Sequence, residues 1–380
     1  MKMERKIKVA NITIIDPVNI GNRLQNYAVQ ELLKNKGCIV DTLYYYVADE
    51  STKSKILSYV ACVLRKVGIY GSNTYIKYIK HSNKMRLAKK FNDKYVNLNK
   101  KYILKLHKKN RILKYVDDYD FYCVGSDQVW NAALVQNNSF FFMDFAESKR
   151  TFSLSASMGT AYIPDKYLDT YINGLKHVGN ISVREEDAKE CIKQLADRES
   201  VVLLDPTLLI SPAKWITLGE KPKFHISKKY IVTYFLGPLS DTQKKYIDEY
   251  AKLNDYEIIE MNGKFKDYVG PSEFIYLISN SKFVFTDSFH GTAFSIIFNK
   301  SFIVFQRNNS YDMSSRIITV LNKFDIMDHF YNKENNELPE DFPDYVKKIE
   351  NSNYNIKLKL DEEKSKVDRF INRCLNMEDK

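Results

Sequence analysis

Cysteine is scarce and irregularly placed in this sequence of 380 residues. Its five cysteines are odd in number, lie far apart and include no Cys-x-x-Cys pair. This usage argues against a disulfide framework and against a thiolate zinc site. Long apolar runs are also missing: no stretch is long enough to span a membrane as a helix, and the first residues lack the apolar core of a signal peptide. We therefore expect a cytoplasmic protein that is not integral to a membrane.

The sequence also lacks the G-x-G-x-x-G fingerprint of dinucleotide-binding folds. The first predicted strand, Lys8 to Ile15, leads into a loop, Asn19-Ile20-Gly21-Asn22-Arg23, with a single glycine. Dinucleotide binding is therefore not supported. No internal repeat, low-complexity tract or cluster of metal-ligating residues stands out, and we expect no metal.

Acidic residues are nearly absent from one segment of this basic chain, whose formal net charge is +11. Residues 51–115 contain eighteen Lys or Arg and a single acid, Asp93, which gives this segment +17 and leaves −6 for the rest. We interpret 51–115 as a helical basic insertion, which is either a solvated face or an anionic-surface contact. The apolar run Ile56 to Leu64 favours a membrane over nucleic acid, because aliphatic residues beside lysines suit an interfacial helix.

The apolar pattern predicts an α/β protein. Composition is that of a globular chain, with 44% hydrophobic and 28% charged residues, and the length suggests two domains. Both halves alternate strand and helix patterns, which favours parallel sheets. We expect two tandem Rossmann-like domains, of the GT-B-like type, with a cleft between them. Their predicted ranges are 1–205 and 206–345, and a helix within 346–380 is expected to pack back across the linker.

Candidate site residues of the first half follow its predicted strands, at the sheet edge where α/β proteins bind ligands. They are Asn22, Arg23, Ser126, Asp127, Trp130, Ser155 and Arg184. Trp130 and Asp127 share one loop, so a sugar stacked on the indole would present a hydroxyl to the carboxylate; alternatively, Trp130 is a core residue. The guanidinium of Arg184 suits a carboxylate or phosphate, or forms an ion pair with a nearby acid.

In the second half, the stretch from Phe283 to Ile297 predicts a buried strand, a polar turn and an apolar helix that begins near Gly291. An anion at such a helix start would meet unpaired amides and the positive end of the helix dipole. The candidates around it are Ser288, His290, Gly291, Thr292, Arg307 and Arg316. The alternative for His290 is a satisfied polar residue in a tight turn.

Five fragments in order resemble the polysaccharide pyruvyl transferase family. They are Gly21-Asn22-Arg23-Leu24-Gln25-Asn26-Tyr27-Ala28, Val124-Gly125-Ser126-Asp127-Gln128-Val129-Trp130, Ser182-Val183-Arg184-Glu185, Asp205-Pro206-Thr207 and Ser288-Phe289-His290-Gly291. The family is similar in fold to GT-B glycosyltransferases, and its members use phosphoenolpyruvate to place a pyruvate ketal on a sugar. The resemblance implies that Arg184 and His290 belong to the donor site. One departure is Ser288, which stands where many members have an arginine.

The resemblance implies a pyruvyl transferase of exopolysaccharide or capsule biosynthesis, with phosphoenolpyruvate as co-substrate and no other cofactor. Its acceptor would be a sugar of a cell-surface polysaccharide or a lipid-linked precursor, met at the inner face of the cytoplasmic membrane. His290 would be the acid or a phosphate donor, and Asp127 would accept the hydroxyl proton. Two other hypotheses are a GT-B glycosyltransferase that uses a nucleotide sugar, and an inactive, membrane-associated binding protein of the same fold.

Overall fold

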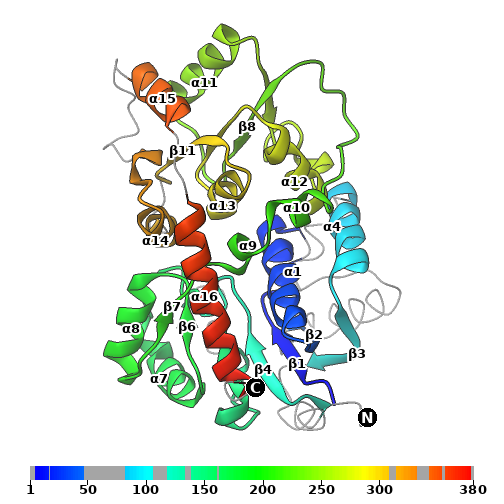
Figure 1. The fold of residues 1–380 in the computed structure, drawn as a ribbon, viewed down its shortest axis with the longest axis vertical. Helices are drawn as coiled ribbons and strands as arrows, with labels where there is room; N and C mark the ends of the chain where they lie inside the picture. The colour runs from blue at the N-terminus through cyan, green and yellow to red at the C-terminus, as the bar shows by residue number, and fades with distance from the viewer. Residues whose placement is uncertain are drawn as a thin grey trace. The chain divides into compact units, whose positions relative to one another are not determined.

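The protein divides into two compact α/β units (Figure 1). Unit 1 comprises Met1–Pro206 and Lys366–Lys380, and unit 2 comprises Thr207–Ser365. The computed structural model describes residues 5–16, 18–46, 82–105, 118–132, 138–160, 162–307, 314–331, 342–352 and 356–377. Each unit contains a five-stranded parallel sheet, as the alternating strand and helix patterns predicted.

Unit 1 opens with β1 (Lys8–Ile12), α1 (Ile20–Asn35), β2 (Ile39–Tyr46), α4 (Ser82–Tyr95) and β3 (Leu98–Lys105). It continues with β4 (Phe121–Val124), η3 (Ser139–Phe142), η4 (Ser148–Arg150), β5 (Thr151–Ser153), η5 (Asp165–Tyr167), α7 (Leu168–His177), β6 (Ser182–Val183), α8 (Glu186–Ala196) and β7 (Val201–Val202). The large sheet has the order β3-β2-β1-β4-β5, and β6 pairs with β7. A single bridge from Ala156 to Val183 links the segment after β5 to β6.

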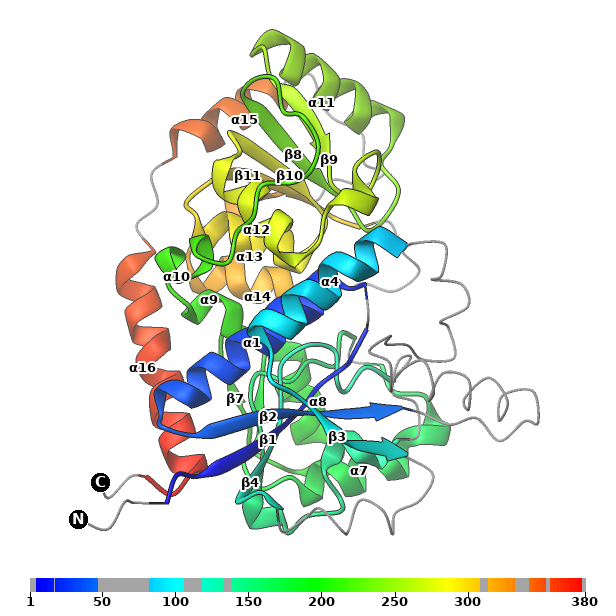
Figure 2. The ribbon, with the colours of Figure 1, turned by 90° about the vertical axis from the view of Figure 1, so that its right-hand side faces the viewer.

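Part of the predicted basic insertion belongs to the sheet. Within 51–115, residues 82–95 form α4, but residues 98–105 form β3, the edge strand, which pairs in parallel with β2. Helices α1 and α4 lie side by side, as Figure 2 shows. Helix α4 therefore belongs to the connection from β2 to β3, and β3 belongs to the sheet. The prediction of a helical insertion over 51–115 is wrong for residues 98–105. The Ile56 to Leu64 run lies outside the described residues.

Unit 2 contains α9 (Pro206–Leu209, whose first residue lies in unit 1), α10 (Pro212–Ile216), β8 (Tyr230–Tyr234), α11 (Asp241–Leu253), β9 (Glu257–Glu260), η6 (Lys266–Tyr268), α12 (Pro271–Asn280), β10 (Phe283–Thr286) and α13 (Phe289–Ile297). It ends with β11 (Ser301–Phe305), α14 (Ser315–Lys323), η7 (Met327–His329), β12 (Phe330–Tyr331) and α15 (Phe342–Asn351). The strand order is β12-β11-β10-β8-β9. In Figure 2, α11 and α15 cover one face of this sheet, and α12, α13 and α14 cover the other.

The core of unit 2 follows the alternation of its strands. Phe283 and Phe285 of β10 point to one face, where both pack against Tyr250 of α11 in a cluster that also contains Phe342 of α15. Val284 between them is equally buried on the opposite face. Because both faces are covered by helices, β10 reads as a continuous apolar run, and its first polar residues come at its carboxyl end.

The last described helix, α16 (Lys357–Cys374), contributes to both units, since the division falls between Ser365 and Lys366. Its first half is tied to unit 2 by an ion pair between Glu363 and Lys323 at 3.0 Å. Its second half is tied to unit 1 by an ion pair between Asp368 and Lys36 at 2.8 Å.

Candidate functional site

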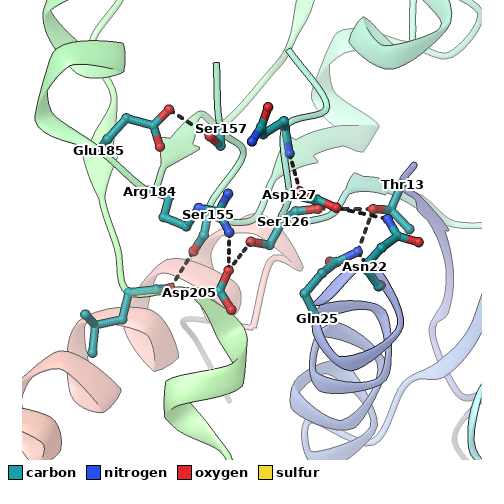
Figure 3. Close-up of polar contacts among 12 residues, drawn as sticks. Thr13, Asn22, Gln25, Ser126, Asp127, Ser155, Ser157, Arg184, Glu185 and Asp205 are labelled. Carbon is teal, nitrogen blue, oxygen red and sulfur yellow. Dashed lines mark hydrogen bonds and ion pairs between the residues drawn. The ribbon is translucent and has the colours of Figure 1, made fainter. Parts of the chain in front are cut away.

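Polar side chains collect at the carboxyl edge of the unit 1 sheet (Figure 3). Thr13 follows β1, and its hydroxyl donates to the backbone carbonyl of Ser126 at 3.0 Å. Gln25 of α1 donates to Thr13 Oγ1 at 2.8 Å. Asn22, one turn earlier in α1, donates from Nδ2 to Asp127 Oδ2 at 3.0 Å. The parallel strands β1 and β4 end at the same edge, which is why α1 and the loop after β4 meet there.

Asp127 has an unusual backbone conformation, with φ of 88°. Few non-glycine residues adopt positive φ, and such residues are found more often at functional sites. Its Oδ1 accepts a hydrogen bond from the Gln128 amide at 2.8 Å, while Asn22 holds Oδ2. The side chain is thus fixed at both oxygens in a residue that is 9% exposed. The role of Asp127 as a base stays a prediction.

Arg184 and Asp205 form a fully buried ion pair. The Arg184 Nη1 atom lies 2.5 Å from Asp205 Oδ2, and both side chains have 0% exposure. Ser126 Oγ donates to the same carboxylate oxygen at 2.7 Å. Asp205 therefore joins the loop after β4 to the segment after β6. The ion pair that the sequence left open as an alternative for Arg184 is present, and it fixes the direction of the guanidinium.

Glu185 turns to a different loop from its neighbour Arg184 (Figure 3). Its Oε1 accepts three hydrogen bonds: from Ser157 Oγ at 2.9 Å, from the Met158 amide at 2.8 Å and from the Gly159 amide at 3.2 Å. The residue is 2% exposed. A buried carboxylate is stabilised by such donors, and here it holds the loop that follows the β5 region.

Two other candidates of unit 1 are buried. Ser155 Oγ donates to the Leu204 carbonyl at 2.7 Å, and the Ser155 amide donates to Ser182 Oγ at 3.0 Å. Ser155 thus joins the segment after β5 to Ser182 of β6 and to Leu204 after β7. Arg23 of α1 is 1% exposed.

Trp130 is a core residue. Its exposure is 0%, its ring stacks on Phe142 with centroids 5.7 Å apart, and its indole N–H donates to the Phe141 carbonyl at 3.0 Å. The prediction that a sugar stacks on Trp130 is therefore wrong. A single sequence does not show which aromatic ring after a strand turns inward, because the answer depends on residues far along the chain such as Tyr171, whose hydroxyl donates to the Trp130 carbonyl.

At the carboxyl edge of the unit 2 sheet, Ser288 caps α13. Its Oγ accepts a hydrogen bond from the Gly291 amide at 3.4 Å, and its own amide donates to Thr286 Oγ1 at 3.0 Å. The helix begins at Phe289, two residues before the predicted start, because Ser288 is a favourable N-cap residue. His290 lies in the first turn, partly exposed, and its ring packs edge-on to Phe289 with centroids 5.3 Å apart.

The amides of Gly291 and Thr292 already have partners. Gly291 donates to Ser288 Oγ, and Thr292 donates to the Ser288 carbonyl from its amide at 2.9 Å and from its hydroxyl at 3.0 Å. The prediction that an anion meets unpaired amides at this helix start is therefore wrong for these two residues, whose amides belong to the helix cap. Gly291 is also required sterically, since a Cβ there would lie 2.3 Å from Thr286 Oγ1.

Asp287 organises the same edge. Its carboxylate accepts from the Leu236 amide at 2.7 Å, from the Gly237 amide at 2.8 Å and from Arg307 Nε at 3.0 Å. Arg307 Nη2 also donates to the Asp287 carbonyl at 3.0 Å. The segments after β8, β10 and β11 are thus held by one carboxylate.

Arg316, in the first turn of α14, approaches the motif from another side. It is 7% exposed, and its guanidinium carbon lies 6.0 Å from the centroid of the Phe289 ring, a cation–π contact. Arg307 and Arg316 therefore contact Asp287 and Phe289, the residues on either side of Ser288. The predicted candidates of unit 2 are gathered around one helix start.

Sequence reasoning did not assign roles to Glu185, Asp205 or Asp287. The first two lie inside the quoted motif fragments, and Asp287 directly precedes Ser288. In the sequence, the signal that could have identified Glu185 and Asp287 is a carboxylate near a candidate arginine or histidine. The residue that each carboxylate bonds is determined only by the fold.

The sequence model of the family described as "Polysaccharide pyruvyl transferase" matches residues 19–309. This chain belongs to that family. Its residues in the match include all the motif fragments and every candidate except Arg316. A search of curated proteins finds no match for this pyruvyl transferase family member.

Solved structures show the fold of this family member. A UDP-GlcNAc 2-epimerase from Methanocaldococcus jannaschii is 12% identical, with a TM-score of 0.54, over 96% of this chain and 99% of that one. A UDP-GlcNAc 2-epimerase from Neisseria meningitidis, bound to UDP-GlcNAc, is 12% identical with a TM-score of 0.46, over 97% and 100% of the two chains. The first likeness confirms the predicted fold, two Rossmann-like units of the GT-B type, and at this identity it shows the fold alone.

No described helix is long and apolar enough to cross a membrane. No group of three or more His, Cys, Asp or Glu among the described residues has a geometry that could hold a metal ion.

Proposed function

We propose that this protein transfers the pyruvyl group of phosphoenolpyruvate to a sugar of a cell-surface polysaccharide or its lipid-linked precursor, with formation of a pyruvate ketal. The observation that supports this most strongly is the joining of four family fragments at one sheet edge. Asn22 bonds Asp127, and Ser126 and Arg184 both bond Asp205. Fragments up to 183 positions apart in sequence form one network, as expected of a built site rather than of scattered similarity.

The reaction has defined proton requirements. The methylene carbon of phosphoenolpyruvate gains a proton, the neighbouring carbon is attacked by one sugar hydroxyl, and phosphate leaves as a second hydroxyl closes the ketal. One hydroxyl proton replaces the proton given by the acid, and the other leaves with phosphate. An acid, an anion clamp and a base are therefore needed.

The residues suit these roles as follows. His290, in the first turn of α13 and partly exposed, is the acid or a phosphate donor. Arg184 pairs with the substrate carboxylate, oriented by Asp205. Asp127, oriented by Asn22, accepts the hydroxyl proton.

The charge that Ser288 does not supply comes from Arg307 and Arg316. One is bonded to Asp287 and the other lies over Phe289, so both flank position 288. With Asp287, this group carries a net charge of +1, which favours a phosphate beside the two arginines rather than on the capped amides of α13. We propose that these two arginines compensate for the departure of Ser288 from the family pattern.

Titration calorimetry with phosphoenolpyruvate, compared with uridine and guanosine diphosphate sugars, tests the donor. We expect phosphoenolpyruvate to bind and the nucleotide sugars not to bind. The His290→Ala variant should abolish acceptor-dependent phosphate release, whereas His225→Ala, at an exposed position of the same unit, should not. Binding of a nucleotide sugar without binding of phosphoenolpyruvate would support the glycosyltransferase alternative instead.

We further propose that residues 51–115 bring the enzyme to anionic lipid at the inner face of the cytoplasmic membrane. Their local charge of +17 supports this, at about 1 kcal/mol for each cation near the surface. Flotation should show binding to anionic and not neutral vesicles, weakened by salt because screening acts beyond about 8 Å. Tight binding to RNA under the same conditions, or indifference to both vesicles, would count against the proposal.

A further inference from the structure

A pocket of about 360 Å³ lies at the carboxyl edge of the unit 2 sheet, beside the strands β8 and β9. Its apolar lining includes Phe235, Ile247 and Ile258, from β8's end, α11 and β9. Its polar side chains are those of Thr233, Lys244, Asp248, Glu260 and Asn262. No role predicted from the sequence involves these residues. The volume is at the lower end of the range of about 300–1,000 Å³ for ligand pockets, so the site fits a small ligand.

The place of Glu260 in the fold defines what it can bind. Helix α11 connects β8 to β9 in one β-α-β unit, and Glu260 is the last residue of the second strand. In Rossmann folds an acidic residue about 20 positions after the first turn of such a unit accepts hydrogen bonds from ribose hydroxyls. The carboxylate has the same position here, although the glycine fingerprint for a pyrophosphate is missing. It suits a pair of neighbouring hydroxyls without requiring a phosphate.

The charge of the lining disfavours an anionic ligand. The lining contains one lysine, Lys244, and two acidic residues, Asp248 and Glu260, so its net charge is −1. The start of α11 offers little to an anion either, because Ser240 and Gln243 close a capping box there. A phosphate would therefore meet two carboxylates and a capped helix. A neutral ligand with hydroxyls would instead find hydrogen-bond acceptors in the two carboxylates, a donor in the lysine and an apolar wall.

Hydrogen bonds between side chains and the backbone hold the pocket wall in place. The Asn262 side chain donates to the Phe235 carbonyl at 2.9 Å, which joins the segments after β9 and β8. Gly237, also in the lining, donates its amide to Asp287, the carboxylate that holds Arg307. A ligand in the pocket thus lies next to the network that carries the family motif of unit 2.

We propose that this pocket binds a neutral sugar ring, with Glu260 accepting hydrogen bonds from neighbouring hydroxyls and with Phe235 and Ile258 against its apolar face. The proposal goes beyond the proposed function, since it concerns a second site and does not depend on pyruvyl transfer. In the context of that function, the occupant is a sugar unit of the acceptor.

Saturation-transfer NMR on the full chain tests this with the methyl glycosides of glucose, galactose and N-acetylglucosamine as probes. At least one glycoside should show transfer, and inorganic phosphate should not reduce it. Glu260→Gln should weaken the affinity about tenfold, the effect expected for loss of a hydrogen bond to a charged group. Glu249→Gln, the same change on an exposed residue of α11, should leave it unchanged.

Three results would overturn the proposal: no transfer to any of the three glycosides, equal affinity for the wild type and Glu260→Gln, or displacement by phosphate. Because binding is the readout, a failure here leaves phosphoenolpyruvate binding unaffected, and a failure of the donor titration leaves this result unaffected. Thermal unfolding of both variants shows whether they are folded, and we expect unchanged midpoints because both glutamates are exposed.

Discussion

Loss of the buried pair between Arg184 and Asp205 should destabilise unit 1 strongly. Both side chains have 0% exposure and their atoms lie 2.5 Å apart. Removing one partner leaves the other charge buried, which costs about 3–5 kcal/mol. We therefore expect Arg184→Met to lower the free energy of unfolding by that amount.

The two tryptophans make the measurement specific for each unit. Trp130 lies in unit 1 and Trp215 in unit 2, and both are fully buried. In a Trp215→Phe background, urea unfolding followed by fluorescence reports unit 1 alone. The exposed pair of Arg5 with Asp120, 2.9 Å apart in the same unit, provides the control. Arg5→Ala should cost less than about 1 kcal/mol.

A double-mutant cycle separates the charge effect from packing. Asp205→Asn keeps an oxygen for Ser126 and removes the negative charge, so the combination with Arg184→Met leaves no lone buried ion. The double variant should be more stable than the sum of the two single changes predicts. Strict additivity, or a cost for Arg184→Met no larger than for Arg5→Ala, would refute the reasoning.

Three further changes test other contacts. Burial lowers the pKa of His329, whose Nδ1 donates to the Phe302 carbonyl at 2.8 Å. The unfolded chain therefore takes up the proton first as the pH falls, and the free energy of unfolding of unit 2 should decrease below about pH 6.5. His329→Asn should remove this pH dependence in urea titrations at several pH values. Gly291→Ala should destabilise unit 2 by about 1–3 kcal/mol in thermal unfolding, because the new Cβ would lie 2.3 Å from Thr286 Oγ1; an unchanged midpoint would contradict this. Arg198→Ala should lower the free energy of unfolding of unit 1 by about 2 kcal/mol in urea, because the Arg198 guanidinium donates to four carbonyls at and just after the end of α7. Arg198→Lys should restore only part of this stability.

The strands and helices with strong periodicity could be predicted from the sequence. The expected strand Lys8 to Ile15 begins with β1, and the strand and helix expected within Phe283 to Ile297 correspond to β10 and α13. Such elements are set by local apolar spacing and caps, which a single sequence displays. The fold class followed from them.

Side-chain partners could not be predicted in the same way. The loop after β4 was expected at a sheet edge, and Asp127 lies there, but Trp130 three residues later turns into the core. Likewise β3 was missed, because its residues Leu98–Lys105 include three lysines and lie at the sheet edge, where a strand needs fewer apolar residues. In each case the deciding contact comes from a distant segment.

Each unit uses one buried aspartate to set an arginine at its sheet edge. Asp205 holds Arg184 in unit 1, and Asp287 holds Arg307 in unit 2. A guanidinium fixed in this way loses little conformational entropy when it binds an anion, which favours precise recognition. Ser288 fits the same logic, because as the cap of α13 it makes a hydrogen bond that an arginine side chain, which has no acceptor, cannot make. Ser288 therefore keeps the start of α13 capped, while Arg307 and Arg316 contact the residues on either side of it.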